Sequence, residues 1–399
     1  MHLPHLFYVK KKDDTMKDFI RKFTEYFKTA PAAAAQAPGR LEVLGNHTDY
    51  NEGLVLSCAV GQKTRFAVTP VPGRSSCNVV DFRSGEAMSF SLDAMDEPPP
   101  ANGCAYIIGM MNEMRKRGAA FTGFDAAIES DVPLSAGMSS SAALETAAGL
   151  ALGKAFDFEL SRAEWARAGQ GVENNFLGLK SGLLDQFSSI FGQKDAIIMS
   201  DFRSVEVVDT LPLQPGYVFA VINSMKKHHL VDSDYNVRRE NCESAAGKLA
   251  AIYPQVRTLR DVTPEMLESA ADKLSFLELS RARHVVNECF RVKQAAKILR
   301  TGNMEEFGQL LYDSHESSRL NFENSTPELD YLVELSRSVP GCIGARLSGG
   351  GFGGITIHLV RAGEAEIYCR RVCTAYKAQT GIDAEHFICS IGSGAEVAL

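Results

Sequence analysis

Apolar residues recur at helical spacing in several parts of the chain. Between residues 15 and 29 the apolar positions share one helical face, which predicts a helix. A capping box, Ser161 with Glu164, opens another predicted helix that carries Glu173 near its end. The same spacing predicts further helices over residues 106–117, 233–252, 264–274, 280–299, 305–319, 327–339 and 362–379.

Shorter runs of β-branched and apolar residues predict strands, which cover residues 54–60, 63–69, 124–130, 196–200, 217–223, 355–359 and 385–391. The alanine-rich segment 30–38 has a proline near each end and is predicted to be a connector. A chain of 399 residues exceeds the usual size of a single core, so we expect two domains. Two prolines and a glycine in residues 211–216 place their boundary between 15–210 and 211–399, with the last strand free to return to the first domain.

Polar side chains are concentrated in residues 39–53 (GRLEVLGNHTDYNEG), directly after a strand-like run. Asn46, His47, Asp49 and Tyr50 follow one another with almost no apolar residue between them. Such a density of hydrogen-bonding groups suits recognition of a polyol. Asn, Asp and Gly are also ordinary turn residues, so this stretch taken alone favours a surface turn.

A second stretch, residues 132–156 (VPLSAGMSSSAALETAAGLALGKAF), passes from small polar residues into an Ala- and Leu-rich helix. Gly137 and the three serines 139–141 lie where that helix begins. Free backbone N–H groups and the positive end of the helix dipole therefore face a loop without bulky side chains, which is typical of phosphate binding. The alternative is that the serines only cap the helix, and the stretch alone does not separate the two.

Asp185 lies among apolar neighbours, Leu183, Leu184 and Phe187. A carboxylate in such surroundings must be paired, must cap a helix or must be functional, and helix capping is the commoner reason.

Residues 346–360 (RLSGGGFGGITIHLV) match the dinucleotide-binding pattern GxGxxG at Gly349, Gly351 and Gly354. That pattern needs a helix after it, whereas the residues that follow here predict a strand. We therefore interpret the segment as a glycine-rich turn that another backbone or a ligand approaches closely.

The overall composition narrows the class of protein. Hydrophobic residues make up 45% of the chain and charged residues 23%, as in ordinary soluble globular proteins. The net charge of -7 and the lack of a basic stripe with interleaved aromatic residues argue against nucleic-acid binding. The nine cysteines are scattered without CxxC pairs, which indicates neither a disulfide framework nor a zinc site. Without an apolar leader or an apolar run of about 18 residues, a cytoplasmic protein that does not contact membranes is expected.

Three motifs, GRLEVLGNHTDY, PLSAGMSSSAALE and LSGGGFGGITIHLV, occur in an order that resembles the GHMP small-molecule kinases, specifically galactokinases. Residues 223–243 and the SGLLDQF sequence around Asp185 extend this resemblance over most of the chain. It implies an α+β, two-lobed GHMP kinase fold with the active site in the cleft. The N-terminal lobe, 15–210, would mix strands and helices, and the C-terminal lobe, 211–399, would be ferredoxin-like.

The resemblance also implies an activity, the ATP-dependent phosphorylation of galactose, or of a close galactose-like sugar, at its C1 hydroxyl. Asp185 would be the base and Arg40 would stabilise charge beside it. Ser140 and Glu173 would hold Mg²⁺, a hard cation that binds oxygen ligands and bridges phosphates. Sugar recognition would fall to Asn46, His47, Asp49, Gly182, Asp185 and Tyr235, and ATP binding to Gly137, Ser139, Ser140, Ser141 and Tyr106.

Two positions depart from the family pattern. Galactokinases usually have glutamate at the position of Asn46, which faces the C6 hydroxyl of the sugar. A neutral amide repels a C6 carboxylate less than glutamate would, so galacturonate becomes an alternative substrate, beside N-acetylgalactosamine and L-arabinose. Gly103 stands where the family usually has a tryptophan near the adenine, which leaves ATP as the default nucleotide.

A second class of function is a regulator, because some relatives of galactokinases sense sugar and ATP without useful turnover. The dipeptide Ser141-Ala142, which partly distinguishes the enzymes, is present together with Arg40 and Asp185. These residues favour catalysis. The expected partners are a small-molecule sugar and ATP, and the expected state is a monomer or weak dimer.

Overall fold

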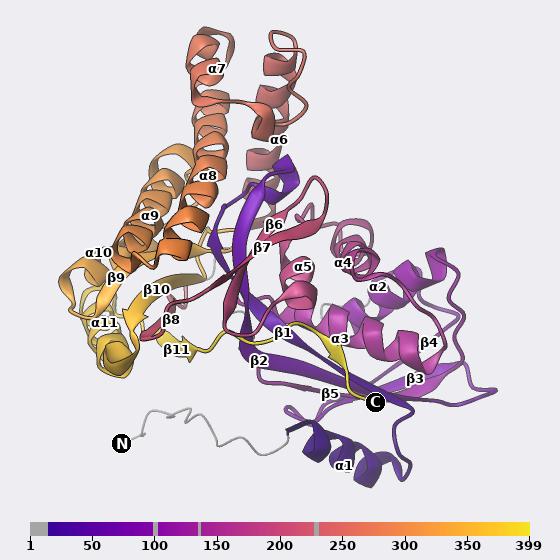
Figure 1. Ribbon diagram of the computed structural model, residues 1–399. Helices are drawn as coiled ribbons and strands as arrows, with labels where there is room; N and C mark the ends of the chain where they lie inside the picture. Colours follow the sequence, from indigo (N-terminus) through magenta and orange to yellow (C-terminus); the bar gives the residue numbers. More distant parts are fainter. Residues whose placement is uncertain (1–14, 99–102, 135–136, 227–230) are drawn as a thin grey trace.

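Two β-sheets of unequal size, each covered by helices, organise the chain (Figure 1). The computed structural model describes residues 15–98, 103–134, 137–226 and 231–399. Residues 135–136 of the serine loop and residues 227–230 of the segment 223–243 lie outside the described residues. None of the helices that the described residues form is long and apolar enough to cross a membrane.

The larger sheet has eight strands, in the order β12-β1-β2-β5-β3-β4, with β6 paired to β2 and β7 paired to β6. All pairs are antiparallel except β3 with β5. The strands are β1 (Ala33–Leu44), β2 (Leu54–Pro70), β3 (Ser76–Asp81), β4 (Ala87–Ser91), β5 (Phe124–Ser130), β6 (Ala196–Asp201), β7 (Glu206–Pro212) and β12 (Glu396–Val397).

Strand β1 includes most of the alanine-rich segment, so the prediction of a connector over 30–38 was wrong. Helix α1 (Thr15–Phe27) covers one face of the sheet, where Ala34 packs with Phe19 and Phe23. Helices α2 (Gly103–Lys116) and α3 (Ser140–Ala155) cover the other face, where Ala33 and Ala35 lie in the main core. With helices on both faces, the strand shows no alternation of polar and apolar residues, and its small side chains let the helices approach closely.

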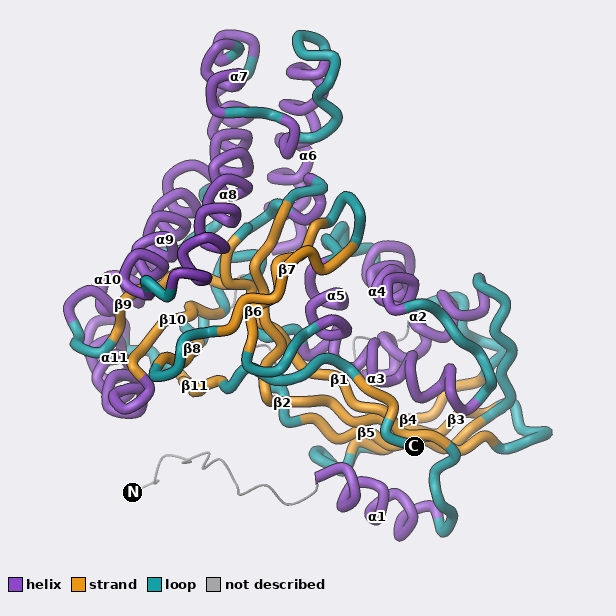
Figure 2. The backbone as a smooth tube through the Cα atoms, in the orientation of Figure 1, coloured by secondary structure: helices purple, strands orange, loops and turns teal. Residues whose placement is uncertain are grey.

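Strand β2 is continuous, although two strands, 54–60 and 63–69, were predicted. Its first half pairs with β6 and its second half with β5, while β1 lies along both (Figure 2). Gly61 and Gln62, which lie between the two predicted strands, interrupt the apolar pattern, and Gly61 is the most exposed residue of this strand.

The remaining helices of this lobe position the candidate site. α4 (Arg162–Gly171) begins at Ser161, whose capping box with Glu164 is formed as predicted. A π-helical turn (Val172–Phe176) continues α4 and carries Glu173, and α5 (Leu184–Phe191) carries Asp185 in its first turn.

The smaller sheet contains β8 (Tyr217–Asn223), β9 (Cys342–Ser348), β10 (Ile355–Arg361) and β11 (Glu385–Cys389). Its strands are antiparallel and follow the order β11-β8-β10-β9. Several helices connect β8 to β9 and one α-helix connects β10 to β11, which is the arrangement of a ferredoxin-like lobe with an enlarged first helical connection. The helices are α6 (Val231–Ala250), α7 (Pro264–Ser269), α8 (Phe276–Thr301), α9 (Met304–Ser317), α10 (Pro327–Ser338) and α11 (Ala365–Thr380). In Figure 1, α6, α7 and α8 stand above the rest of the molecule.

One hydrophobic cluster joins the two sheets. Leu41 of β1 and Leu56 of β2 are packed in the same cluster as Phe219 of β8, Ile357 of β10 and Val292 of α8. The predicted boundary at 210/211 falls within β7, and the return of the chain to the first sheet is made by β12, which follows the predicted last strand. Burial of shared apolar surface therefore holds the sheets, and the cleft between them, in one arrangement.

The anchoring of α5 can be tested at Phe187, which has no exposed surface and stacks on Phe191 with 4.2 Å between ring centroids. Phe187→Ala is expected to lower the free energy of unfolding by about 3–5 kcal/mol, because it removes buried surface and leaves a cavity. Phe276→Ala is the matched control, since this ring is 77% exposed, and should change it by less than about 0.5 kcal/mol. Urea denaturation measures both, and equal effects would contradict the packing described.

Candidate active site

A pocket between the two sheets brings together most of the predicted site residues. It is lined from β1, from the turn after β1, from the start of α5, from α6 and from the glycine-rich turn after β9. The predicted residues that line it are Arg40, Asn46, His47, Asp49, Glu173, Gly182, Asp185 and Tyr235.

Arg40 and Asp185 form a bidentate ion pair in this pocket. Arg40 Nε donates to Asp185 Oδ1 and Arg40 Nη2 donates to Asp185 Oδ2, both at 2.9 Å. Two parallel charge-assisted bonds fix the plane and the direction of the carboxylate. Asp185 lies inside the first turn of α5 and is paired, so the helix-cap interpretation does not apply.

The serine loop meets this ion pair. Arg40 Nη1 donates to Gly137 O at 2.6 Å, and the backbone N–H of Arg40 donates to Met138 O at 3.0 Å. Gly39 permits the approach, because a Cβ there would lie 2.4 Å from Met138 O. The loop is therefore held against β1 beside the predicted catalytic residues.

Ser139 does not cap helix α3 with its side chain, so capping does not account for this serine. It is the N-cap residue of α3 but has left-handed backbone geometry, with φ 55°, and its side chain caps nothing. Its hydroxyl instead donates to Asp185 Oδ2. Ser140 and Ser141 form the first turn of α3, while Tyr106 is half-buried on α2, and all three lie outside the pocket.

Two further carboxyl groups lie near Asp185. Burial, together with the charge of Asp185, raises the pKa of Glu173 to about 7. Burial also raises the pKa of Glu145 well above its usual value, and Glu145 Oε2 accepts from Gln186 Nε2 at 2.9 Å. Within the described residues, no three His, Cys, Asp or Glu side chains are grouped to hold a metal ion.

Asp49 and Gly182 form another part of the wall. The backbone N–H of Leu184 donates to Asp49 Oδ2 at 3.3 Å, and a Cβ on Gly182 would lie 1.6 Å from that oxygen. Gly182 is thus required for the close approach of the Asp49 carboxyl group. Burial raises the pKa of Asp49 to about 6, and the charges of Glu42 and Asp185 add to the effect.

His47 is held by neighbours on every side. Its ring stacks on Phe322, with 4.3 Å between centroids, and lies 5.0 Å from the ring of Tyr235. Nε2 is 3.1 Å from Gly350 O and Nδ1 is 3.0 Å from the Tyr50 hydroxyl. A carbonyl only accepts, so Nε2 carries the proton and Nδ1 accepts from Tyr50. Burial lowers the pKa of His47 to about 3, so the ring is neutral.

The glycine-rich turn after β9 is approached closely by other groups, as predicted. Gly351 has φ +83° and a Cβ there would lie 2.2 Å from Asn324 O, while a Cβ on Gly350 would lie 3.5 Å from the ring of Tyr235. A strand, β10, follows the turn, as the sequence indicated.

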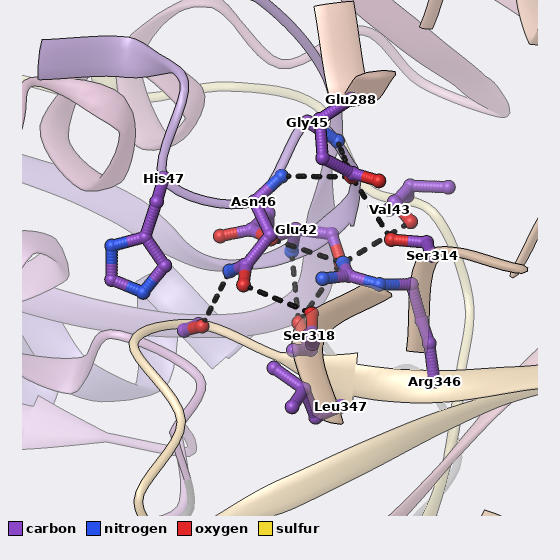
Figure 3. Close-up of polar contacts among 12 residues, drawn as sticks. Glu42, Val43, Gly45, Asn46, His47, Glu288, Ser314, Ser318, Arg346 and Leu347 are labelled. Carbon is purple, nitrogen blue, oxygen red and sulfur yellow. Dashed lines mark hydrogen bonds and ion pairs between the residues drawn. The ribbon is translucent and has the colours of Figure 1, made fainter. Parts of the chain in front are cut away.

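Sequence reasoning missed Glu42 of the pocket wall and two charged residues, Arg346 and Glu288, that support this wall. Asn46 lies within hydrogen-bonding distance of Glu42, and Glu42 forms an ion pair with Arg346 of β9 (Figure 3). Glu288 of α8 accepts from the backbone N–H groups of Gly45 and Asn46. A signal for Glu42 was present, because it is a charged residue within the apolar run of Leu41, Val43 and Leu44.

Three models of known families match separate parts of the chain. Residues 21–70 match the galactokinase galactose-binding signature, residues 105–193 match the GHMP kinases N-terminal domain, and residues 295–378 match the GHMP kinases C-terminal domain. The galactokinase of Actinobacillus pleuropneumoniae serotype 5b is 40% identical over 381 residues, which cover 94% of this chain and 97% of that protein. The galactokinase of Glaesserella parasuis is 38% identical over 383 residues.

Solved structures agree with these sequence matches. The crystal structure of Lactococcus lactis galactokinase complexed with galactose superposes with a TM-score of 0.89 at 29% identity, and the match covers 96% of this chain and 99% of that one. A mevalonate kinase, at 17% identity and a TM-score of 0.58, shares the fold. The predicted two-lobed fold is confirmed, and the chain belongs to the galactokinase family of the GHMP kinases.

Proposed function

We propose that this protein transfers the γ-phosphoryl group of ATP to the C1 hydroxyl of galactose, giving the sugar 1-phosphate and ADP. One observation carries the proposal: the Arg40–Asp185 ion pair faces the pocket and is bonded on its other side to Gly137 and Ser139 of the serine loop. A sugar hydroxyl bound in the pocket and a phosphate bound on the loop would meet at this pair.

Asp185 acts as the general base in this proposal. It is oriented by two bonds from Arg40, and it accepts the proton of the C1 hydroxyl as the oxygen attacks the phosphorus. Arg40 offsets negative charge on the transferring group, and the start of α3 offers backbone N–H groups to the phosphates. Positioning and electrostatics supply most of the rate in phosphoryl transfer, and the base contributes roughly 10²–10⁴-fold.

Ser140 and Glu173 suit Mg²⁺ because both offer oxygen, Ser140 from the start of α3 and Glu173 from a position close to Asp185. Ser140 follows Ser139 directly, and Glu173 lies close enough for the charge of Asp185 to raise its pKa. A second acidic group beside Asp185 leaves negative charge that a divalent cation would balance. A Mg²⁺ ion held by these residues would supply positive charge to the phosphates of ATP.

Sugar hydroxyls are proposed to bind Asp49 and Tyr235, with His47 and Gly182 shaping the wall. Asp49 comes from the turn after β1 and Tyr235 from α6, and both line the same pocket as Asp185. Because both His47 nitrogens are engaged, His47 supports the wall and Tyr235 rather than supplying a free polar group.

Measurement of ADP release with galactose, with identification of the product, tests this function. Turnover separates an enzyme from a sugar- and ATP-sensing regulator, which binds both without releasing ADP. A nucleotide panel extends the test, because Gly103 begins α2 without the family's aromatic ring. We expect a monomer or weak dimer that works in the cytoplasm, where its nine cysteines stay reduced.

The role of Asp185 is tested by Asp185→Asn, which keeps the size and a hydrogen-bonding oxygen but removes the base. We expect kcat for galactose to fall by about 10²–10⁴-fold, while KM changes little. Asp209→Asn is the matched control, because Asp209 is also paired with an arginine, Arg300, and lies outside the pocket. Steady-state kinetics and a thermal unfolding curve measure both variants, and unchanged kcat in a folded Asp185→Asn protein would refute the assignment.

The raised pKa of Asp49 predicts a pH effect on stability. The folded pKa of about 6 exceeds the ordinary value of 3.8, so the folded protein holds this proton more tightly than the unfolded chain. The resulting stabilisation is fully present below about pH 4 and is lost as the pH rises through 6. Asp49→Asn removes this dependence, so the variant should gain about 1 kcal/mol relative to the wild type between pH 5 and pH 7.5. Urea denaturation without sugar at the two pH values measures the gain, and a constant difference would contradict it.

A further inference from the structure

The side chain of Asn46 has no hydrogen-bonding capacity left for a ligand. Nδ2 donates to Glu42 Oε1 and to Gly349 O, each at 2.9 Å. Oδ1 accepts from Asn324 Nδ2 at 2.9 Å and from Ser318 Oγ at 3.3 Å. An amide has two donor hydrogens and two acceptor lone pairs, so all four are used inside the protein.

Glu42, next to Asn46, has a free oxygen. Its Oε1 accepts from Asn46 Nδ2 and from Arg346 Nη1 at 3.0 Å, whereas Oε2 accepts from none of the described residues. Glu42 is 3% exposed and lines the pocket, and Oε2 is not among the polar atoms sealed in the interior without a partner. A nearly buried carboxylate oxygen of this kind is best satisfied by a donor that enters the pocket, and sugar hydroxyls are such donors.

The place of Glu42 on β1 relates it to the catalytic pair. Arg40 and Glu42 are two residues apart, and regular pairing of Arg40 with Ala59 and of Glu42 with Ser57 keeps both on one face of the strand. Their Cα atoms are thus separated by about 6.6 Å, which is comparable with the length of a hexopyranose. A sugar whose C1 hydroxyl lies at Asp185, beside Arg40, would place its C6 end toward Glu42.

We propose that Glu42 is the residue that selects the C6 group of the sugar, by accepting a hydrogen bond from its hydroxyl through Oε2. Asn46 and Arg346 are positioning residues that hold Oε1 and so direct Oε2 into the pocket. The inference rests on the proposed function, since it takes the C1 hydroxyl to be at Asp185.

The selection has a charge component. Although Asn46 itself is neutral, this wall carries a negative charge, because the Glu42 carboxylate lies within 2.9 Å of the Asn46 amide. Arg346 balances Glu42 from the buried side and has no exposed surface, so its charge is not presented to the pocket. A C6 carboxylate would meet the Glu42 carboxylate, so this wall favours a neutral C6 hydroxymethyl group and disfavours a uronic acid.

The wild-type protein gives the first test. Values of kcat/KM are measured for galactose, for galacturonate and for L-arabinose, which has the hydroxyl pattern of galactose without the C6 group. Galactose should exceed L-arabinose by about 10- to 100-fold, the range of a hydrogen bond to a charged group, and galacturonate should be poorer still. Galacturonate turnover equal to that of galactose would overturn the proposal. If no sugar is phosphorylated, the proposed function fails instead.

The second test is Glu42→Gln, which removes the charge and keeps the shape. The ratio of kcat/KM for galactose to that for L-arabinose should fall about 10-fold or more, mainly through KM for galactose. The penalty on galacturonate relative to galactose should shrink. A purely structural role would reduce turnover of all three sugars together, so an unchanged galactose to L-arabinose ratio overturns the proposal.

A matched control and a second variant keep this test decisive. Glu129→Gln removes a carboxylate of β5 that pairs with Lys22 of α1 away from the pocket, and it should leave the sugar ratio unchanged. Because Glu42 is the ion-pair partner of buried Arg346, thermal unfolding must show that Glu42→Gln folds. If it does not, Glu42→Asp keeps a charge for Arg346 but withdraws the oxygens by one methylene, and the same loss of sugar ratio is expected.

Discussion

Two buried charges of opposite sign, two residues apart on β1, constrain the arrangement of the whole site. Arg40 pairs with Asp185 from α5, and Glu42 pairs with Arg346 from β9 of the smaller sheet. A buried ion is costly unless it is paired, so each charge requires its partner. Ser348 adds a bond across the same junction, because its hydroxyl donates to Glu42 O. The strand can therefore reach its place in the core only when both partner elements are in theirs.

The turn that follows β1 is held by the second lobe as well as by hydrogen bonds among its own residues. Glu288 Oε2 accepts from the backbone N–H groups of Gly45 and Asn46 and from the hydroxyl of Ser314. His284 Nε2 donates to Asn46 O at 3.1 Å, and burial lowers the pKa of His284 well below its usual value. The polar turn is thus an interior structure, in which carboxylate and imidazole groups replace the water that a surface turn would bind.

The sequence predicted most of the helices, whose apolar periodicity is set by one partner face, and the strands β5, β6, β8, β10 and β11. It failed at residues 30–38, where helices on both faces remove the periodicity, and at residues 61–62, where Gly61 and Gln62 lie within a continuous strand. It also failed to predict the short helix α5. Much of the site could be predicted, because the motifs that resemble a known family named Arg40, Asp49, Asp185 and Tyr235, and all four residues line one pocket. Periodicity and motifs did not show which charged residues form ion pairs. Arg346 directly precedes the third motif, and nothing in the sequence indicates that it pairs with Glu42.

The hydrogen bond between Asn46 and Glu42 also explains why position 46 alone is a poor guide to the chemistry of this pocket wall. An amide at position 46 suggests lost charge when it is considered alone, but its hydrogen bond to Glu42 means that the two side chains act as a unit. A strand residue such as Glu42 is held by its ladder, by Arg346 and by Asn46, and so loses less side-chain entropy on binding a sugar than a group on a free turn. The Glu42 carboxylate is therefore better preorganised on β1 than a carboxylate on the turn would be. The Asn46 amide contributes to this, because it bonds Oε1 of Glu42 and leaves Oε2 free for a ligand.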